Sequence, residues 1–155
     1  MSRVYRQVAV IPYRVHEECV EIALVTSYGG KRWVVPKGSI GHGEAAMDAA
    51  IRETEEEAGL LGELVERPIG RYRYTKRRDS YDVDVYLMRV TVVLDSWMED
   101  EHRRRHFMTV QDALARLHPD LHGFVHEADD LVRSQGRRTS GSAFRSVAWG
   151  FAGDA

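Results

Sequence analysis

The chain of 155 residues is 43% hydrophobic and carries 22 basic and 24 acidic residues, which leaves a formal net charge of −2. This composition suits one globular domain with a buried core and argues against a chain that binds nucleic acid through overall basicity. Cys19 is the only cysteine, the first residues lack the apolar core of a signal peptide, and no apolar run approaches the roughly 20 residues that span a bilayer, so we expect a cytoplasmic protein without a membrane role.

Two paired strands are predicted at the start of the chain. Residues 4–15 and 20–27 are rich in β-forming residues and are separated by a polar turn. A third, short strand spans residues 32–35, and Pro36 is expected to end it just before a glycine-rich loop. The loop is therefore predicted to follow a strand directly.

This loop leads into a helix that is dense in carboxylates, within residues 38–60. Glu53, Glu56 and Glu57 are spaced i, i+3 and i+4, so the helical repeat places them on one face. Like charges at this spacing repel one another unless a cation neutralises them, and carboxylate oxygens suit a hard divalent ion. The pattern therefore predicts a Mg2+ site, with Mn2+ as the alternative ion.

The other side of the same helix carries an apolar stripe that should pack on a sheet. Met47, Ile51, Thr54 and Ala58 recur at steps of three and four residues. Gly59 follows the last of them, as expected of a left-handed C-cap. Both the buried face and the end of the helix are thus predicted.

The second half of the chain is predicted to continue with strands. Residues 62–75 indicate a strand that is interrupted near residues 68–70, and residues 76–79 form a charged hairpin turn. The returning strand, residues 81–94, alternates at first and then becomes apolar throughout. That change predicts a central strand buried on both faces.

Two helices are expected near the end. Thr109 suits the N-cap of a helix through Leu117, and Pro119 suits the first position of a last helix that ends near Arg133. Residues 134–155 lack a sustained period, which predicts a mobile C-terminal tail after one domain of residues 1–133. Strands and helices mixed in this order predict an α/β fold.

The stretch around the acidic helix resembles the signature of the Nudix hydrolases. Gly38, five residues, Glu44, seven residues and the run RETEEEAGL at 52–60 match it in register, with Thr54 where the family prefers an aliphatic residue. The resemblance implies a Nudix-type α/β/α sandwich with a mixed β-sheet. It also implies a Mg2+-dependent hydrolase that cleaves a diphosphate linkage in a polyphosphorylated substrate.

The resemblance also assigns the site residues. The metal ligands would be three carboxylates and one backbone carbonyl, which belong to Glu53, Glu56, Glu57 and Lys37. Arg52 and Glu44 complete the catalytic set and would orient these groups. The general base stays open between the helix glutamates and a carboxylate outside the helix, for which Glu99 and Glu101 are candidates.

Basic residues on the surrounding loops, together with a loop glycine, are the candidates for substrate binding: Arg6, Lys37, Gly38, Arg77, Arg78 and Arg104. The flanking sequences RWVVPKG at 32–38 and LDSW at 94–97 resemble the branch that hydrolyses diadenosine or diphosphoinositol polyphosphates. A small phosphorylated molecule is therefore the expected partner.

Two groups of alternatives stay open. The enzyme could be a nucleoside triphosphate or ADP-ribose pyrophosphatase. The chain could also be a catalytically silent Nudix-fold module that binds a ligand or nucleic acid, although the near-neutral charge disfavours nucleic acid. A homodimer is left open as well.

Overall fold

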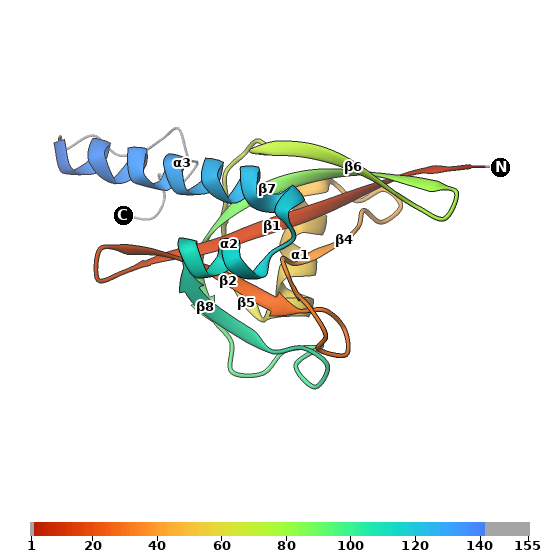
Figure 1. Ribbon diagram of the computed structural model, residues 1–155, viewed down its shortest axis with the longest axis horizontal. Helices are drawn as coiled ribbons and strands as arrows, with labels where there is room; N and C mark the ends of the chain where they lie inside the picture. Colours follow the sequence, from red (N-terminus) through yellow and green to blue (C-terminus); the bar gives the residue numbers. More distant parts are fainter. Residues whose placement is uncertain (1, 142–155) are drawn as a thin grey trace.

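The computed structural model describes residues 2–141 (Figure 1). The elements in chain order are β1 (Val4–His16), β2 (Cys19–Thr26), β3 (Trp33–Val34), β4 (Lys37–Ser39), α1 (Ala46–Ala58), β5 (Leu60–Leu64), β6 (Gly70–Lys76), β7 (Asp79–Val93), β8 (Arg105–Thr109), α2 (Val110–Arg116), the 3-10 turn η1 (Pro119–Leu121) and α3 (His122–Gly141). Among these described helices, none is both long enough and apolar enough to cross a lipid bilayer.

A single mixed sheet forms the middle layer of the fold. β1 runs parallel to β7 and antiparallel to β2 and β4. On its other side β7 pairs antiparallel with both β5 and β6, while β3 and β8 pair with β2. Since β1 and β7 are far apart in the sequence, their parallel pairing joins the two halves of the chain.

Helices cover both faces of this sheet, because neighbouring residues of β1 point to opposite sides. Val8 and Val10 pack with Ala49 and Ala50 of α1. Ala9 and its odd-numbered neighbours belong instead to the cluster that α2 and α3 close on the opposite face. The predicted α/β/α sandwich with a mixed sheet is therefore confirmed (Figure 1).

The short strand predicted before Pro36 is present as β3, which ends at Val34. The Pro36 carbonyl accepts a hydrogen bond from the Val10 amide at 2.9 Å, so at this residue the chain passes from β2, the partner of β3, to β1. The chain then continues as β4, in which Lys37 and Gly38 pair with β1. The first residues of the predicted glycine loop are thus held in the sheet.

The central position of β7 is confirmed, but burial of its last residues on both faces is not. Val92 and Val93 are 42% and 43% exposed. The reason lies in the pairing, since β1 stays beside β7 only as far as Arg89 and only β5 accompanies the last residues. Apolar composition alone does not reveal this loss of a neighbour.

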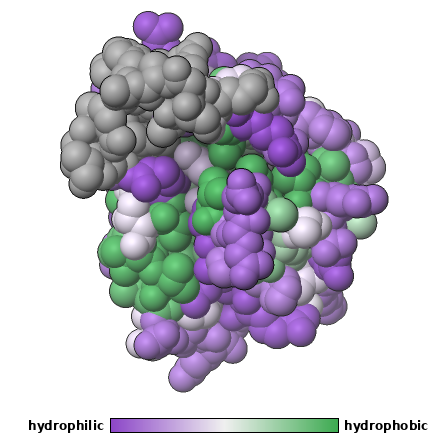
Figure 2. All heavy atoms as spheres, turned by 90° about the vertical axis from the view of Figure 1, so that its left-hand side faces the viewer, coloured by the Kyte–Doolittle hydropathy of each residue, from purple (hydrophilic) through white to green (hydrophobic). Residues whose placement is uncertain are grey.

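The last helix differs from the prediction at both ends. Pro119 opens the turn η1 rather than the helix itself, and α3 begins at His122. The helix continues to Gly141, past the expected end near Arg133. The proposed domain boundary at residue 133 stays a prediction, and residues 142–155 of the predicted tail lie outside the described residues. Figure 2 shows the end of the molecule where α3 and the β1–β2 hairpin lie, and hydrophobic residues there form patches among hydrophilic ones.

Candidate active site

Helix α1 presents its carboxylates from a firmly packed position. Ala50 and Thr54 are completely buried, and the Thr54 hydroxyl donates to the Ala50 carbonyl at 2.7 Å, so threonine is accommodated where an aliphatic residue was expected. Ile51 lies about 100° round the helix from Ala50 and is 36% exposed. It therefore does not belong to the buried stripe in which it was predicted. The buried face is centred on Ala50, Thr54 and Glu57 instead.

The C-terminal end of α1 is held by the loop that follows β7 and by the first residue of β8. Gly59 adopts the predicted left-handed conformation with φ 63°. Arg105 donates from Nη1 to the Ala58 carbonyl at 2.8 Å and to the Leu94 carbonyl at 2.9 Å, which satisfies a free carbonyl of the last turn. Trp97 donates from Nε1 to the Glu57 carbonyl at 3.0 Å. These contacts fix the turn that bears Glu57.

Glu57 is a buried carboxylate, with only 6% of the residue exposed. Burial raises the pKa of Glu57 to about 8, and the neighbouring Glu53 raises it too, whereas the Lys37 amide and Arg103 lower it. The Lys37 amide donates to Glu57 Oε1 at 3.1 Å. A carboxylate with this raised pKa favours a cation beside it, because a positive charge stabilises the ionised form.

Gly38 allows a second carboxylate to approach the same strand. A Cβ atom on residue 38 would overlap the carboxyl carbon of Glu53. Because β4 holds the backbone of Gly38 against β1, the strand cannot easily retreat. The carboxylates of Glu53 and Glu57 therefore both lie beside the backbone of Lys37 and Gly38.

Arg52 organises the rest of the acidic cluster. Its Nε lies 2.9 Å from Glu44 Oε2, while its Nη1 lies 2.9 Å from Glu53 Oε1 and 3.5 Å from Glu56 Oε1. The Arg52 hydrogen bond, followed by that of the Gly41 amide, lowers the pKa of Glu44 to about 2. Arg52 thus links Glu44 to the helix carboxylates, and the orienting role expected of these two residues stays a prediction.

A second arginine reaches the cluster from the loop between β7 and β8. Arg103 is only 12% exposed, and its guanidinium lies 3.5 Å from Glu57 and 2.7 Å from Glu99. The Glu99 amide also donates to the Glu56 carbonyl at 3.1 Å, whereas Glu101 is exposed. Of the two loop carboxylates that the sequence offered, the structure brings Glu99 to the site.

These residues fit a hard divalent cation in their chemistry. They supply carboxylate oxygens, one of them buried with a raised pKa, beside a glycine that leaves room for Glu53. Within residues 2–141, no three histidine, cysteine, aspartate or glutamate side chains are grouped so as to hold a metal ion. The oxygens of Glu53, Glu56 and Glu57 are engaged by Arg52 and Arg103 instead. Shared coordination of one ion by these glutamates stays a prediction.

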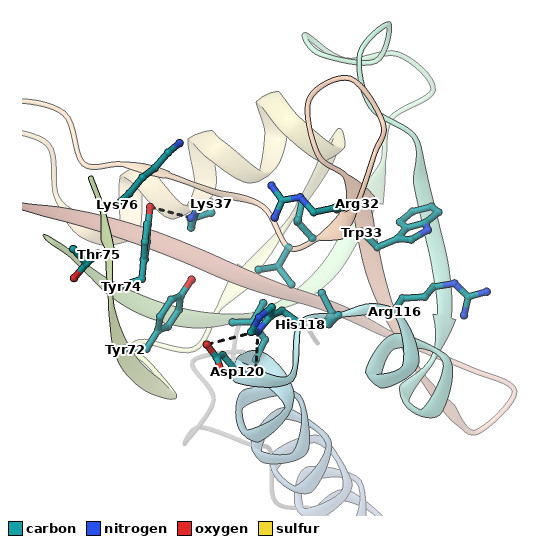
Figure 3. A pocket seen from close by; sticks show the side chains of 14 residues that line it. Arg32, Trp33, Lys37, Tyr72, Tyr74, Thr75, Lys76, Arg116, His118 and Asp120 are labelled. Atoms are coloured by element: carbon teal, nitrogen blue, oxygen red, sulfur yellow. Dashed lines mark hydrogen bonds and ion pairs between the residues drawn. The ribbon is translucent and has the colours of Figure 1, made fainter. Parts of the chain in front are cut away.

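A pocket of about 660 Å³ lies next to this cluster, between β3, β4, β6 and the α2–α3 connection (Figure 3). Its polar and aromatic lining is supplied by Arg32, Trp33, Lys37, Tyr72, Tyr74, Thr75, Lys76, Arg116, His118 and Asp120. Lys37 belongs to both places, since its amide contacts Glu57 and its side chain lines the pocket. Lys37 thus connects the acidic cluster with the cations and aromatic rings of the pocket.

Comparison with known proteins identifies the family. A family model described as a NUDIX domain matches residues 5–128. The chain belongs to the Nudix family. Nudix hydrolase 4 of Arabidopsis thaliana is 35% identical over 120 residues, which cover 70% of this chain and 58% of that protein. Diphosphoinositol polyphosphate phosphohydrolase 3-beta of Bos taurus is 31% identical over 141 residues, which cover 89% of this chain and 84% of that protein.

The solved structures agree on the fold. The crystal structure of C. elegans Ap4A hydrolase superimposes with a TM-score of 0.68 at 21% identity, covering 83% of this chain and 98% of that one. The chain spans only 58% and 59% of the lengths of Nudix hydrolases 4 and 21 of Arabidopsis thaliana. Family and fold are thus shown.

The substrate-binding candidates of this Nudix chain are spread over different places. Arg77 and Arg78 lie in the turn between β6 and β7, outside the residues that line the pocket. Arg6 lies beside a separate depression and pairs with Asp84 at 3.5 Å. The guanidinium of Arg104 lies 5.5 Å from the centre of the Trp33 ring, and Trp33 lines the pocket. Only Lys37 and Gly38 directly adjoin the carboxylates.

Two residues that act on the pocket, Tyr74 from its lining and Gln7 behind it in the hydrogen-bond chain, could not be identified from the sequence. Tyr74 and Gln7 form a hydrogen bond at 2.7 Å although they lie 67 residues apart. A weak signal was present, because Tyr72 and Tyr74 are two positions apart on one strand and must share a face. Nothing local in the sequence, however, connects Gln7 with that face.

Proposed function

We propose that this Nudix protein is a Mg2+-dependent hydrolase that cleaves a diphosphate linkage in a polyphosphorylated small molecule. The observation that carries the proposal is the position of Lys37. Its amide donates to the buried Glu57 at 3.1 Å, and its side chain lines the pocket with other cations and aromatic rings. A substrate phosphate held there would lie beside the carboxylate cluster.

The roles of the residues follow from this arrangement. Glu53, Glu56, Glu57 and the Lys37 carbonyl would hold the ion, which supplies charge neutralisation and activation of the attacking water. Arg52 keeps Glu53 and Glu44 in place through its ion pairs. Water would then attack phosphorus, the bond to the leaving phosphate oxygen would break, and the proton of the water would pass to a carboxylate base, for which the helix glutamates and Glu99 are the candidates. A catalytically silent binding module would have no need of this complete set.

Within this reaction class we favour a dinucleoside polyphosphate as the substrate. The pocket offers aromatic rings, among them Trp33 and Tyr72, which can stack on a base, together with Lys37 and Lys76 for a linear phosphate chain. A diphosphoinositol polyphosphate, the substrate class that the Bos taurus relative's name indicates, is the second candidate. It requires a denser set of cations and no base-stacking surface.

A substrate screen tests the proposal. Purified protein with Mg2+ is incubated with dinucleoside polyphosphates, diphosphoinositol phosphates, nucleoside triphosphates, ADP-ribose and capped RNA, and products are separated by ion-exchange chromatography. We expect the highest kcat/KM for a dinucleoside polyphosphate and no turnover in EDTA. Absence of turnover on every substrate would reject the enzymatic assignment in favour of a binding module.

A double substitution separates the two leading substrates. Because Arg77 and Arg78 lie outside the pocket lining, neutralising both should change KM for a dinucleoside polyphosphate by less than about twofold. The matched substitution Lys76→Met removes a charge from the lining and should raise KM by about tenfold. A steep rise in KM for the Arg77/Arg78 variant would instead support the inositol substrate, whose clustered phosphates need more cations.

Location and assembly also stay proposals. We retain the cytoplasm as the expected compartment, although names of relatives include chloroplastic and mitochondrial forms. A homodimer is still open, and sedimentation of the purified chain would measure the assembly state.

A further inference from the structure

Lys37 is held in the pocket by a chain of two hydrogen bonds. Its ammonium donates to the Tyr74 hydroxyl at 3.1 Å and lies 4.2 Å from the centre of the same ring (Figure 3). The Tyr74 hydroxyl in turn donates to Gln7 Oε1 at 2.7 Å. Since an ammonium can only donate, the phenol oxygen must accept from Lys37 and use its own proton toward Gln7. The direction of the whole chain is thereby fixed.

Tyr74 is itself anchored from the other side. Its ring stacks on the Tyr81 ring, with centroids 4.8 Å apart and planes 10° apart. The pairing of β6 with β7 places these two residues directly opposite each other. The phenol therefore has little freedom to move away from Lys37.

We propose that Tyr74 and Gln7 are positioning residues that hold the Lys37 ammonium ready to bind a phosphate of the substrate chain. This inference rests on the proposed function. A free lysine side chain loses substantial rotamer entropy when it is fixed by a ligand, and a preformed contact removes much of that cost. The Lys37 backbone is already fixed at Glu57, so ordering its side chain defines where a phosphate lies relative to the carboxylates.

The test uses Tyr74→Phe, which keeps the ring and removes only the hydroxyl. We expect the Kd for a methylene-bridged dinucleoside tetraphosphate, measured by calorimetry with Mg2+, to rise about fivefold, because one long side chain loses its preorganisation. KM should rise in parallel while kcat changes little. Tyr81→Phe makes the same change on the stacked neighbour and should leave Kd unaltered.

A double-mutant cycle distinguishes positioning from a direct contact. In the Lys37→Met background, Tyr74→Phe should have no further effect on Kd, because its influence passes through the ammonium. An undiminished effect in that background, or a Kd for Tyr74→Phe equal to that of the wild type, would overturn the inference. If Tyr74→Phe fails to fold, Gln7→Leu tests the same chain and should raise Kd in the same direction, and an unchanged Kd again overturns it. Failure of the wild type to bind or hydrolyse the substrate class would reject the proposed function instead.

Discussion

Replacing Glu57 by glutamine is expected to lower kcat by about 10²-fold or more while the fold persists, because a metal-binding carboxylate loses its charge. The substitution should not destabilise the protein in metal-free buffer. Burial raises the pKa of Glu57 to about 8, so the folded protein binds this proton more tightly than the unfolded chain does. The resulting contribution to the free energy of unfolding is complete below the ordinary glutamate pKa and is lost as the pH rises through 8. Glutamine avoids that loss.

The comparison requires kinetics with Mg2+ and thermal unfolding in EDTA from below the ordinary glutamate pKa to above the raised pKa of about 8. Glu55→Gln is the matched control, since it removes the same charge from an exposed position of the same helix. We expect normal turnover for Glu55→Gln. A Glu57→Gln enzyme with near-normal kcat and an unchanged metal requirement would contradict the role assigned to Glu57.

Gly38→Ala is expected to cause the second large loss, about 10²-fold in kcat/KM, because the new methyl group would overlap the carboxyl group of Glu53. Glu53 must then move away from β4, and Mn2+ binding measured by electron paramagnetic resonance should weaken in parallel. The backbone of Gly38 does not lie in the left-handed region, so alanine adds no backbone strain there. The expected defect is therefore in the site rather than in the fold.

Gly123→Ala provides the control for this substitution. It lies in α3, and an added methyl group there meets no atom within 4 Å. We expect unchanged kcat/KM and slightly higher helix stability for this variant. Equal Mn2+ affinity in Gly38→Ala and the wild type would show that Glu53 does not need its place beside residue 38.

Local spacing explains why much of this site could be predicted from the sequence. The 3.6-residue repeat places Glu53, Glu56 and Glu57 together regardless of the rest of the fold. The same repeat predicted the helix, and Gly59 predicted where the helix ends. The rotation of the helix was harder, because Ile51 and Glu57 compete for the buried face and only packing on β1 decides between them.

Contacts between distant segments could not be predicted in this way. Tyr74 meets Lys37 and Gln7 because β6 and β1 both lie beside β7 in a particular register. A shift by one residue would turn each of these side chains to the opposite face. Arg103 likewise reaches Glu57 only through the path of the loop after β7. No local pattern in the sequence specifies these registers.

Hydrolysis of a dinucleoside tetraphosphate in 18O-labelled water tests the central claim most directly. With Mg2+ and wild-type protein, mass spectrometry of the products should show one 18O atom on a single nucleotide product, because water attacks one phosphorus atom and one phosphoanhydride bond breaks. The Glu57→Gln protein should release about 10²-fold less labelled product in the same time. Two results would contradict the assignment of this carboxylate cluster as a diphosphate-hydrolysing site. One is recovery of intact substrate after incubation with the wild type, and the other is equal amounts of labelled product from the wild type and Glu57→Gln.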